Sequence, residues 1–374
     1  MKVAVIGIGG TGSAASRQLA QAGHEAVGFE QFSLGHDRGS SHGESRIIRY
    51  TYPDALYTQM MHDAYPLWDA LQEEAGEELL VRCGGLWFGP EQHPNIVATE
   101  QALCKTNLPF EMLSPEAVGE RFPAIRLRTG ETAIYQPDSG FLRASRCVLA
   151  NARLARSQGA VLHENAPVRE ILSRGEHVVV RTEAGGEEIF DRAIVTAGAW
   201  MGHLFERLNL PLKVTRQEVG YLPIRQNAEW FAPGRLPVWI DAGTRWYGFP
   251  SDGRVEGVKI AWHRHGEIAA PDRVRRTVDD SYQRAAAEYA AERLPNLGGE
   301  VVHANVCLYT STPDEHFIID RAPDLPNVWL VSGCSGHGFK FTVLLGKIAA
   351  DLATGKDYPR NLSRFALSRA FPTP

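Results

Sequence analysis

The stretch KVAVIGIGGTG at residues 2–12 decides the fold of this chain. Its apolar first half predicts a short strand, and the glycine-rich second half predicts a tight turn that opens a helix reaching about residue 22. A second strand over 25–29 then ends in Glu30, where a carboxylate can accept both hydroxyls of an adenosine ribose. The glycines that match the G-x-G-x-x-G spacing are Gly7, Gly9 and Gly12. This is the dinucleotide-binding pattern, with the helix N-terminus facing a pyrophosphate, and it does not by itself separate NAD from FAD.

Two later glycine-rich stretches carry a related signal. AIVTAGAW at 193–200 is a strand that runs into small residues, which let the backbone pass close to a nucleotide, although a plain strand-to-helix turn would look similar. VWLVSGCSGHGFK at 328–340 predicts a strand and a glycine loop that feed a helix over about 341–353. A helix N-terminus favours negative charge, such as that on the N1/O2 edge of a reduced flavin.

Size and composition favour a two-domain soluble protein. The 374 residues exceed one ordinary core, and 44% hydrophobic with 22% charged residues is typical of globular chains. The formal net charge of -5 argues against nucleic acid or an anionic membrane surface as a main partner. Five scattered cysteines show neither a disulfide framework nor metal-ligand spacing, and no apolar run suits a signal peptide or membrane helix. We therefore expect a cytoplasmic protein without a metal.

Cys307 begins the stretch CLYTSTPDEHFIID, residues 307–320. Apolar residues alternate around it and predict a strand that ends in a Thr-Pro-Asp turn. A buried structural thiol is one interpretation, since free cysteine is among the most buried residue types. The other is a thiolate joined covalently to a flavin, and this interpretation needs support from elsewhere in the chain.

Together these stretches resemble a known family, the monomeric sarcosine oxidases and N-methyltryptophan oxidases, which are covalent flavoproteins of the D-amino-acid-oxidase-like superfamily. The similarity runs nearly end to end. It is carried by GSSHGESRIIR at 39–49, YGFP at 247–250, the Cys307 stretch, and SGHGFKF at 335–341.

The resemblance implies an α/β fold (α+β overall) with a Rossmann-like FAD domain and a discontinuous second domain on an antiparallel sheet. The FAD domain would comprise residues 1–84, 142–212 and 316–374, and the substrate domain residues 85–141 and 213–315. Helical spacing of apolar residues predicts a core helix over 54–76. A further helix is expected over 272–294, with a solvated face formed by Arg273, Arg275 and Arg276 against Asp279 and Asp280.

The resemblance also assigns site residues. Cys307 would form a thioether to the 8α-methyl group of FAD, with Cys334 as its only rival because the glycine loop around it also approaches the flavin. The residues expected to bind the cofactor are Gly7, Gly9, Gly12, Glu30, Ser40, Arg46, Gly198, Trp200, Cys307, Gly336, Gly338 and Lys340. Arg49 and Lys340 would clamp a substrate carboxylate, and Tyr52, Tyr309 and His337 would bind the substrate beside them.

Four residues are expected to take part in the chemistry: Lys259, Arg46, His263 and Tyr247. Lys259 matches the family lysine that stands by flavin N5 and promotes reaction with oxygen. A cation in the apolar strand around it would be costly without a partner, although alternation could instead place Lys259 on a solvent face. His263 shares a predicted strand face with His265 and Glu267, which leaves a metal site as a minor alternative.

The implied reaction is oxidation of a secondary amine, by a monomer, without a nucleic-acid or membrane partner. A sarcosine-like N-methyl amino acid, oxygen and water would give the free amino acid, formaldehyde and hydrogen peroxide. N-methyltryptophan and cyclic imino acids such as proline or pipecolate stay open as substrates. Trp239, Trp246 and Trp262 lie in segments expected to line or back the pocket, where they would shrink it or stack on an aromatic substrate.

Three other classes compete with this interpretation. A nicotinamide-dependent dehydrogenase would share the N-terminal loop but would not explain the Cys307 and Gly-His-Gly-Phe-Lys stretches. A catalytically silent flavin-binding protein would keep the nucleotide motifs, yet both predicted clamp residues, Arg49 and Lys340, are present. A flavin dehydrogenase that passes electrons to a protein or quinone would have no use for Lys259 as an oxygen-activating cation.

Overall fold

The first layer of the fold is a six-stranded sheet in the order β19-β20-β13-β1-β2-β9. The computed structural model describes residues 1–264 and 266–371. The strands are β1 (Lys2–Ile6), β2 (Glu25–Phe29), β9 (Val161–His163), β13 (Arg192–Val195), β19 (Ile318–Ala322) and β20 (Leu325–Ser332). All neighbours pair in parallel except the edge strand β19. A parallel sheet of this kind needs cover on both faces, which explains the near-continuous apolar strands.

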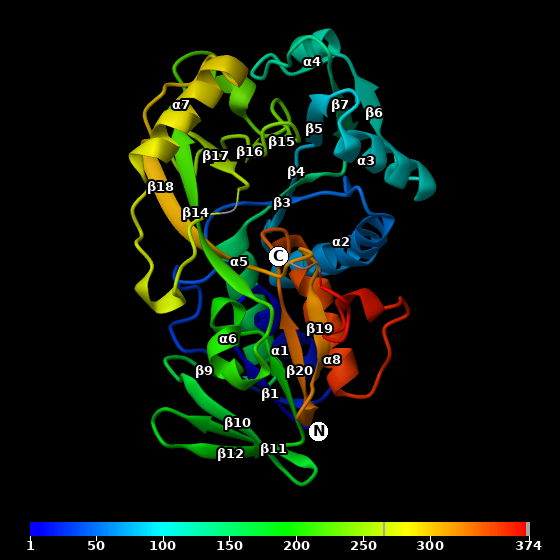
Figure 1. The fold of residues 1–374 in the computed structure, drawn as a ribbon, viewed down its shortest axis with the longest axis vertical. Helices are drawn as coiled ribbons and strands as arrows, with labels where there is room; N and C mark the ends of the chain where they lie inside the picture. The colour runs from blue at the N-terminus through cyan, green and yellow to red at the C-terminus, as the bar shows by residue number, and fades with distance from the viewer. Residues whose placement is uncertain (265, 372–374) are drawn as a thin grey trace.

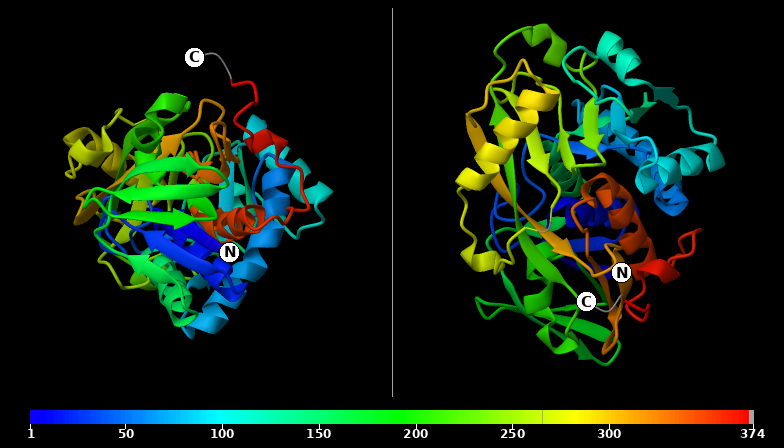
Figure 2. Two further views of the ribbon diagram at one scale, coloured as in Figure 1. Left: turned by 90° about the horizontal axis from the view of Figure 1, so that it is seen from below. Right: turned by 45° about the horizontal axis from the view of Figure 1, so that its top comes forward.

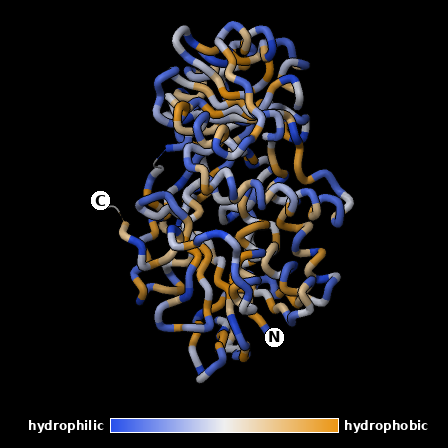
Figure 3. Tube along the Cα trace, turned by 90° about the vertical axis from the view of Figure 1, so that its right-hand side faces the viewer, coloured by the Kyte–Doolittle hydropathy of each residue, from blue (hydrophilic) through white to orange (hydrophobic). Residues whose placement is uncertain are grey.

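Different kinds of structure cover the two faces of this sheet (Figure 1). On one face Val3 and Val5 pack in a core with helices α1 (Gly10–Gln21), α5 (Ala144–Ser157) and α8 (Thr342–Ala353). On the other face Ala4 and Ile6 join a second core with the small sheet β10 (Val168–Arg174), β11 (His177–Thr182) and β12 (Glu187–Phe190). The six-stranded sheet therefore lies between a layer of helices and a layer of β-strands. Figure 3 shows many of the apolar stretches of the chain in the interior of the molecule.

A second large sheet has eight strands in the order β18-β14-β17-β16-β15-β5-β7-β6. They are β5 (Gly85–Pro90), β6 (Glu111–Leu113), β7 (Glu131–Gln136), β14 (Lys213–Leu222), β15 (Val238–Asp241), β16 (Trp246–Gly248), β17 (Val258–Trp262) and β18 (His303–Ser311). All pairs are antiparallel except β15 with β5. Figures 1 and 2 show α7 (Asp280–Arg293) against one side of this sheet. In Figure 1 the six-stranded sheet lies below it.

Smaller elements join the two large sheets. A three-stranded sheet contains β3 (Arg46–Ile48), β8 (Gly140–Leu142) and β4 (Leu80–Arg82). Helix α2 (Ala55–Ala75) confirms the predicted core helix; Asp54 caps its start and Gly76, in the left-handed region, ends it. The remaining helices are α3 (Pro94–Lys105), α4 (Pro115–Arg121) and α6 (Met201–Leu204). The predicted fold class is confirmed, and the proposed domain boundaries stay a prediction.

The helix expected over 272–294 is eight residues too long at its N-terminal end. Residues 271–273 form a short 3-10 turn, and α7 begins only at Asp280. The reason is a tertiary contact, because Arg216 of β14 donates hydrogen bonds to the carbonyls of Arg275 and Thr277, which a helix would need for itself. Arg276 is also not part of a solvated helix face, since its guanidinium binds the carbonyls of Asp37, Arg38 and Val306.

No helix in the described part of the chain combines the length and apolar character needed to cross a membrane.

Candidate active site

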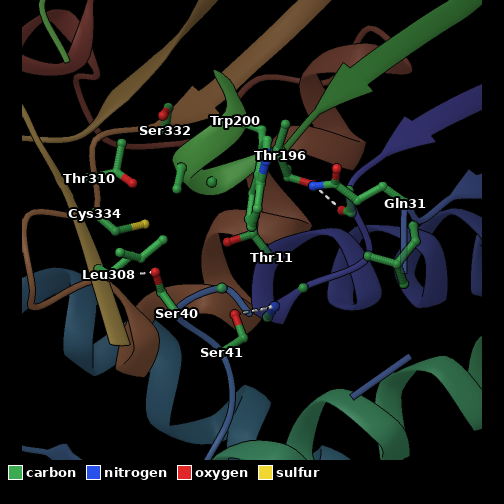
Figure 4. A pocket seen from close by; sticks show the side chains of 18 of the residues that line it. Thr11, Gln31, Ser40, Ser41, Thr196, Trp200, Leu308, Thr310, Ser332 and Cys334 are labelled. Atoms are coloured by element: carbon green, nitrogen blue, oxygen red, sulfur yellow. Dashed lines mark hydrogen bonds between the residues drawn. The ribbon is translucent and has the colours of Figure 1, made fainter. Parts of the chain in front are cut away.

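A cavity of about 550 Å³ lies at the carboxyl ends of the parallel strands β1, β2 and β13. Figure 4 shows it from close by, with Thr11, Trp200, Ser332 and Cys334 around it. Open α/β sheets bind nucleotides at this edge. Eleven residues of the predicted site line the cavity: Gly7, Gly9, Glu30, Ser40, Arg46, Gly198, Trp200, Cys307, Tyr309, Gly336 and Gly338.

The glycines at the floor of the cavity are required by close backbone packing. A Cβ atom on Gly7 would lie 2.8 Å from the Thr196 carbonyl oxygen, and Gly7 has a φ of +90°. A Cβ atom on Gly12 would collide with the Gly7 carbonyl oxygen. Helix α1 begins next to them with no side-chain cap, so its N-terminus can receive an anion. Gly12 itself lies beneath the loop and does not line the cavity.

Glu30 is held firmly at the end of β2. The carboxylate is buried, and its two oxygens accept hydrogen bonds from the backbone N–H groups of Ile8 (2.9 Å) and Phe32 (3.1 Å). Each oxygen keeps a further lone pair, which leaves the carboxylate able to accept a ribose hydroxyl as well. The carboxylate predicted to face the ribose therefore lines the nucleotide cavity and is preorganised there.

The segment 39–41 lines the cavity and is tied to β18 and to the start of α1. Ser40 Oγ donates to the Leu308 carbonyl at 2.5 Å, and Ser41 Oγ accepts from the Gly10 N–H at 3.0 Å (Figure 4). Trp200 Nε1 donates to Asp272 Oδ1 at 2.6 Å. Ser41 and Asp272 are lining residues that the sequence analysis did not single out; the only signal for Ser41 was its place in the GSSHGES string.

Two cysteines line the cavity, and their environments differ. Cys307 lies on β18, buried, in a small cluster with Val219 and Ala261 of the neighbouring strands. Burial raises the pKa of the Cys334 thiol to about 11, and a Cβ atom added to Gly338 would touch Cys334 Sγ at 2.7 Å. Because the thiolate is the nucleophilic form, Cys334 is kept in its unreactive state.

The predicted carboxylate clamp comes together on one tyrosine ring, beside the cavity and outside its lining. The Arg49 guanidinium lies 4.1 Å and the Lys340 Nζ 5.5 Å from the centre of the Tyr52 ring. Lys340 also donates to the Tyr52 hydroxyl (3.0 Å) and the His337 carbonyl (2.7 Å). Among the described residues, no carboxylate lies within ion-pairing distance of the partly buried Arg49 or the buried Lys340, so the two side chains share a site without an anion.

Burial controls the electrostatics of this cluster. It lowers the pKa of Lys340 well below the ordinary value, with Arg49 adding to the effect, and it raises the pKa of Tyr52 to about 12. His337 contacts the Tyr52 hydroxyl through Nδ1 at 3.2 Å and the Glu315 carbonyl through Nε2 at 3.0 Å, and burial lowers its pKa as well. An incoming carboxylate would relieve the repulsion between the cations.

The side chain of Lys259 is buried and does not face solvent, which was the alternative that strand alternation left open. Its Nζ donates to the Ser45 carbonyl (2.7 Å) and hydroxyl (3.1 Å) and lies 4.5 Å from the centre of the Phe249 ring. Burial lowers its pKa well below the usual lysine value, and the nearby Arg46 lowers it further. Arg46 is anchored to the Ser45 and Ser40 carbonyls and lines the cavity.

The remaining predicted residues form an aromatic group next to Cys307. Tyr247 and Tyr309 pack against the Cys307 cluster, and burial raises the pKa of both phenols. The His263 ring lies 5.4 Å from that of Tyr309. The alternative of a metal at His263 has no support in the described residues, where no three possible ligands meet; His265 lies outside the described residues.

The sequence left open whether Trp239, Trp246 and Trp262 line or back the pocket, and none of the three lines the cavity; Trp239 and Trp246 lie behind the sheet. Both belong to the core between the eight-stranded sheet and α7. Trp246 stacks between Trp262 (5.4 Å between ring centres) and Tyr289 (5.1 Å), and Trp262 packs against the same core. The register of the sheet is the cause, because alternate residues of β15 and β16 face opposite sides and Ile240 and Tyr247 take the cavity side.

Comparison with known proteins agrees with this geometry. The family model for FAD-dependent oxidoreductases (DAO) matches residues 2–352. A monomeric sarcosine oxidase from Streptomyces avermitilis is 36% identical over 94% of this chain and 93% of its own length. An N-methyl-L-tryptophan oxidase from Salmonella agona is 32% identical over 98% of both chains. The solved structure of NikD, an unusual amino acid oxidase, superposes with a TM-score of 0.86 at 23% identity, over 98% of this chain and 96% of that one. The chain belongs to the FAD-dependent oxidoreductases and, among them, to the family of monomeric sarcosine oxidases and N-methyltryptophan oxidases.

Proposed function

We propose that this protein is a flavin-dependent oxidase of secondary amines that acts on a small, sarcosine-like N-methyl amino acid. Substrate, oxygen and water would yield the free amino acid, formaldehyde and hydrogen peroxide. The observation that carries the proposal is the convergence of Arg49 and Lys340 on the Tyr52 ring, with no carboxylate of residues 1–264 and 266–371 within ion-pairing distance of either. Such a pair of cations suits the carboxylate of an amino acid.

The residues around the cavity fit FAD. The uncapped start of α1 would receive the pyrophosphate and Glu30 the adenosine ribose, while Gly336 and Gly338 line the opposite wall near the start of α8. When bound, FAD supplies the chemistry by accepting a hydride equivalent from the carbon next to the amine and passing the electrons to oxygen. The family match supports FAD rather than a nicotinamide as the cofactor.

The protein residues bind, orient and tune the substrate. Arg49 and Lys340 would hold the carboxylate, Tyr52 and His337 would fix the position of the lysine, and Tyr247, Tyr309 and His263 would border the reacting end. Four cations, with Lys259 and Arg46 included, also make the site unfavourable for a protonated amine. The amine would therefore bind neutral, with its lone pair available for oxidation.

We further propose that Cys307 holds the flavin covalently as a thioether. Its position on the cavity wall supports this, as does the raised pKa that keeps the rival Cys334 protonated. Cys83 and Cys147 are poor candidates, since burial raises the pKa of Cys83 to about 12 and also raises that of Cys147, and the exposed Cys104 does not line the cavity. None of the five cysteines forms a disulfide, which supports a cytoplasmic location, and the names of the bacterial relatives support a monomer.

A peroxide-coupled screen tests the substrate. Sarcosine is expected to give the highest rate, and formaldehyde should form in equal amount to peroxide. N-methyltryptophan is the second candidate, favoured by the 32% identity to the Salmonella enzymes. Turnover of proline or pipecolate without formaldehyde would point to cyclic imino acids, and absence of peroxide from every amine would contradict an oxidase.

Replacing either clamp residue should weaken carboxylate binding. We expect Arg49→Ala and Lys340→Met each to raise KM for the amino-acid substrate by roughly 10- to 100-fold, because a hydrogen bond to a charged group is lost. Arg284→Ala, on the exposed side of α7, is the matched control and should leave KM unchanged. If Arg49→Ala and Lys340→Met both bind a competing carboxylate as tightly as the wild type does, neither residue is part of a carboxylate clamp.

Carboxylate affinity should depend on pH through Lys340. Its pKa is lowered, so the positive charge is present at low pH and is lost on raising the pH through a value below the ordinary 10.5. Acetate carries no amine and stays ionised above pH 6 or so, and its affinity should therefore fall as the pH rises. Flavin absorbance titrations report this affinity; Lys340→Met should bind acetate more weakly and with a flatter pH profile over the same range.

A further inference from the structure

We propose that Trp87 is a further substrate-binding residue, which stacks on Arg49 and donates its indole N–H to the substrate carboxylate. The inference rests on the proposed function, because it extends the carboxylate clamp of Arg49 and Lys340. It assigns a role to a residue of β5, the strand next to β15 in the large sheet.

The register of the eight-stranded sheet places Trp87 on the cavity side. Trp87 is paired with Ile240, Ile240 with Tyr247, and Tyr247 with Ala261, so the four residues form one row across four strands. Ala261 packs in the cluster of Cys307. The neighbours of Trp87 along β5, Leu86 and Phe88, point the other way into the core beneath α7.

Trp87 forms one wall of the clamp. The Arg49 guanidinium lies 4.4 Å from the centre of the Trp87 ring and 4.1 Å from that of Tyr52. The two rings thereby hold the cation by cation–π contacts while leaving the edge of the guanidinium, where the N–H groups are, for other partners. The Arg49 guanidinium donates a long hydrogen bond, 3.4 Å, to Thr51 Oγ1.

The indole N–H of Trp87 has no acceptor in the part of the chain that the structure describes. The side chain is buried, with 8% of its surface exposed, and Nε1 is among the buried polar atoms without a hydrogen-bond partner. An indole N–H can only donate, and leaving it unsatisfied in the interior costs free energy. A carboxylate bound to Arg49 would bring an acceptor to this ring and remove that cost.

Trp239 shows what a purely structural tryptophan looks like in the same sheet. It lies next to Ile240 on β15, fully buried, and packs over Gly248 in the core under α7. Its Nε1 is also without a hydrogen-bond partner and lies near the Tyr289 hydroxyl, but it lies in that core and no cation–π contact joins its ring to Arg49 or Lys340 among the described residues. Trp87 differs from it by facing the cavity side and by carrying the unpaired cation of Arg49 on its ring.

Acetate binding to the FAD-loaded enzyme, followed by flavin absorbance, tests the proposal without relying on turnover. Trp87→Phe keeps an aromatic ring for Arg49 and removes the N–H, and we expect its Kd for acetate to rise about tenfold. Trp87→His, which restores a ring N–H, should bind acetate more tightly than Trp87→Phe. Trp239→Phe is the control and should bind like the wild type.

The proposal is overturned if Trp87→Phe binds acetate within twofold of the wild type, if Trp87→His is no better than Trp87→Phe, or if Trp239→Phe loses as much affinity. If Trp87→Phe fails to take up FAD, it is replaced by Trp87→Leu, which also lacks a side-chain donor and is judged by the same twofold limit. Failure of the wild type to oxidise any N-methyl amino acid would instead contradict the proposed function. Because acetate binding is measured without turnover, it distinguishes failure of the Trp87 proposal from failure of the proposed function.

Discussion

Replacing Lys259 by methionine is expected to slow reoxidation of the reduced enzyme by oxygen about 10²- to 10³-fold, the cost of losing one preorganised charge at a reacting centre. Lys259 is suited to this role because its Nζ is buried, held by two contacts to Ser45, and has no carboxylate within ion-pairing distance in the described residues. Negative charge that develops on oxygen would be stabilised by this fixed cation. Methionine keeps the length and apolar contacts of the side chain and removes the charge.

Stopped-flow measurements separate the two half-reactions. Anaerobic reduction by the substrate should change far less in Lys259→Met than the reaction of the reduced enzyme with oxygenated buffer. Lys347→Met is the control, since Lys347 pairs with Asp351 at the surface of α8. Because the pKa of Lys259 is lowered, the wild-type oxygen reaction should slow as the pH rises through that pKa, and the methionine variant should lack this slowing. Comparable losses in both half-reactions would contradict the assignment.

Replacing Cys307 by alanine is expected to abolish covalent attachment of the flavin completely. After acid precipitation the wild-type pellet should keep the yellow colour, while Cys307→Ala should release all FAD to the supernatant. The cavity would keep its shape, because the alanine leaves β18 and its pairing with β14 intact. Noncovalent FAD should therefore still bind, through the α1 N-terminus and Glu30.

Cys334→Ala is the informative comparison for attachment, because Cys334 lines the same cavity. Intact-mass measurement should find the flavin on Cys334→Ala and not on Cys307→Ala. The opposite pattern would assign the covalent linkage to Cys334 instead of Cys307. Release of flavin from the acid-precipitated wild type would refute a covalent bond altogether.

Local signals made the nucleotide half of the site predictable. The limits of β1 and β2 and the positions of Gly7, Gly12 and Glu30 all follow from neighbours within thirty residues of sequence. Such contacts are specified by backbone sterics and hydrogen bonds that adjacent residues supply. The family resemblance then added Arg49, Lys259, Cys307 and Lys340, whose roles no periodicity or spacing in this chain would have shown.

Errors arose where distant residues competed with local preference. Alanine-rich spacing favoured a helix from 272, yet Arg216, more than fifty residues earlier, takes the carbonyls of Arg275 and Thr277. The sequence could not decide which way the tryptophans face, because a single residue of register moves a side chain to the other face of a sheet. Pairing partners set that register, and they are distant in sequence.

The sequence alone was enough to determine a dinucleotide-binding α/β protein with a family-specific cysteine and cations. Only the three-dimensional arrangement brought Trp87 onto the Arg49 guanidinium and Lys340 onto the Tyr52 ring, which Arg49 also contacts. The physical reason is that strand alternation and helix starts are local properties of the chain. Whether Trp87 faces Arg49 depends instead on how β5 pairs with strands that are distant in the sequence.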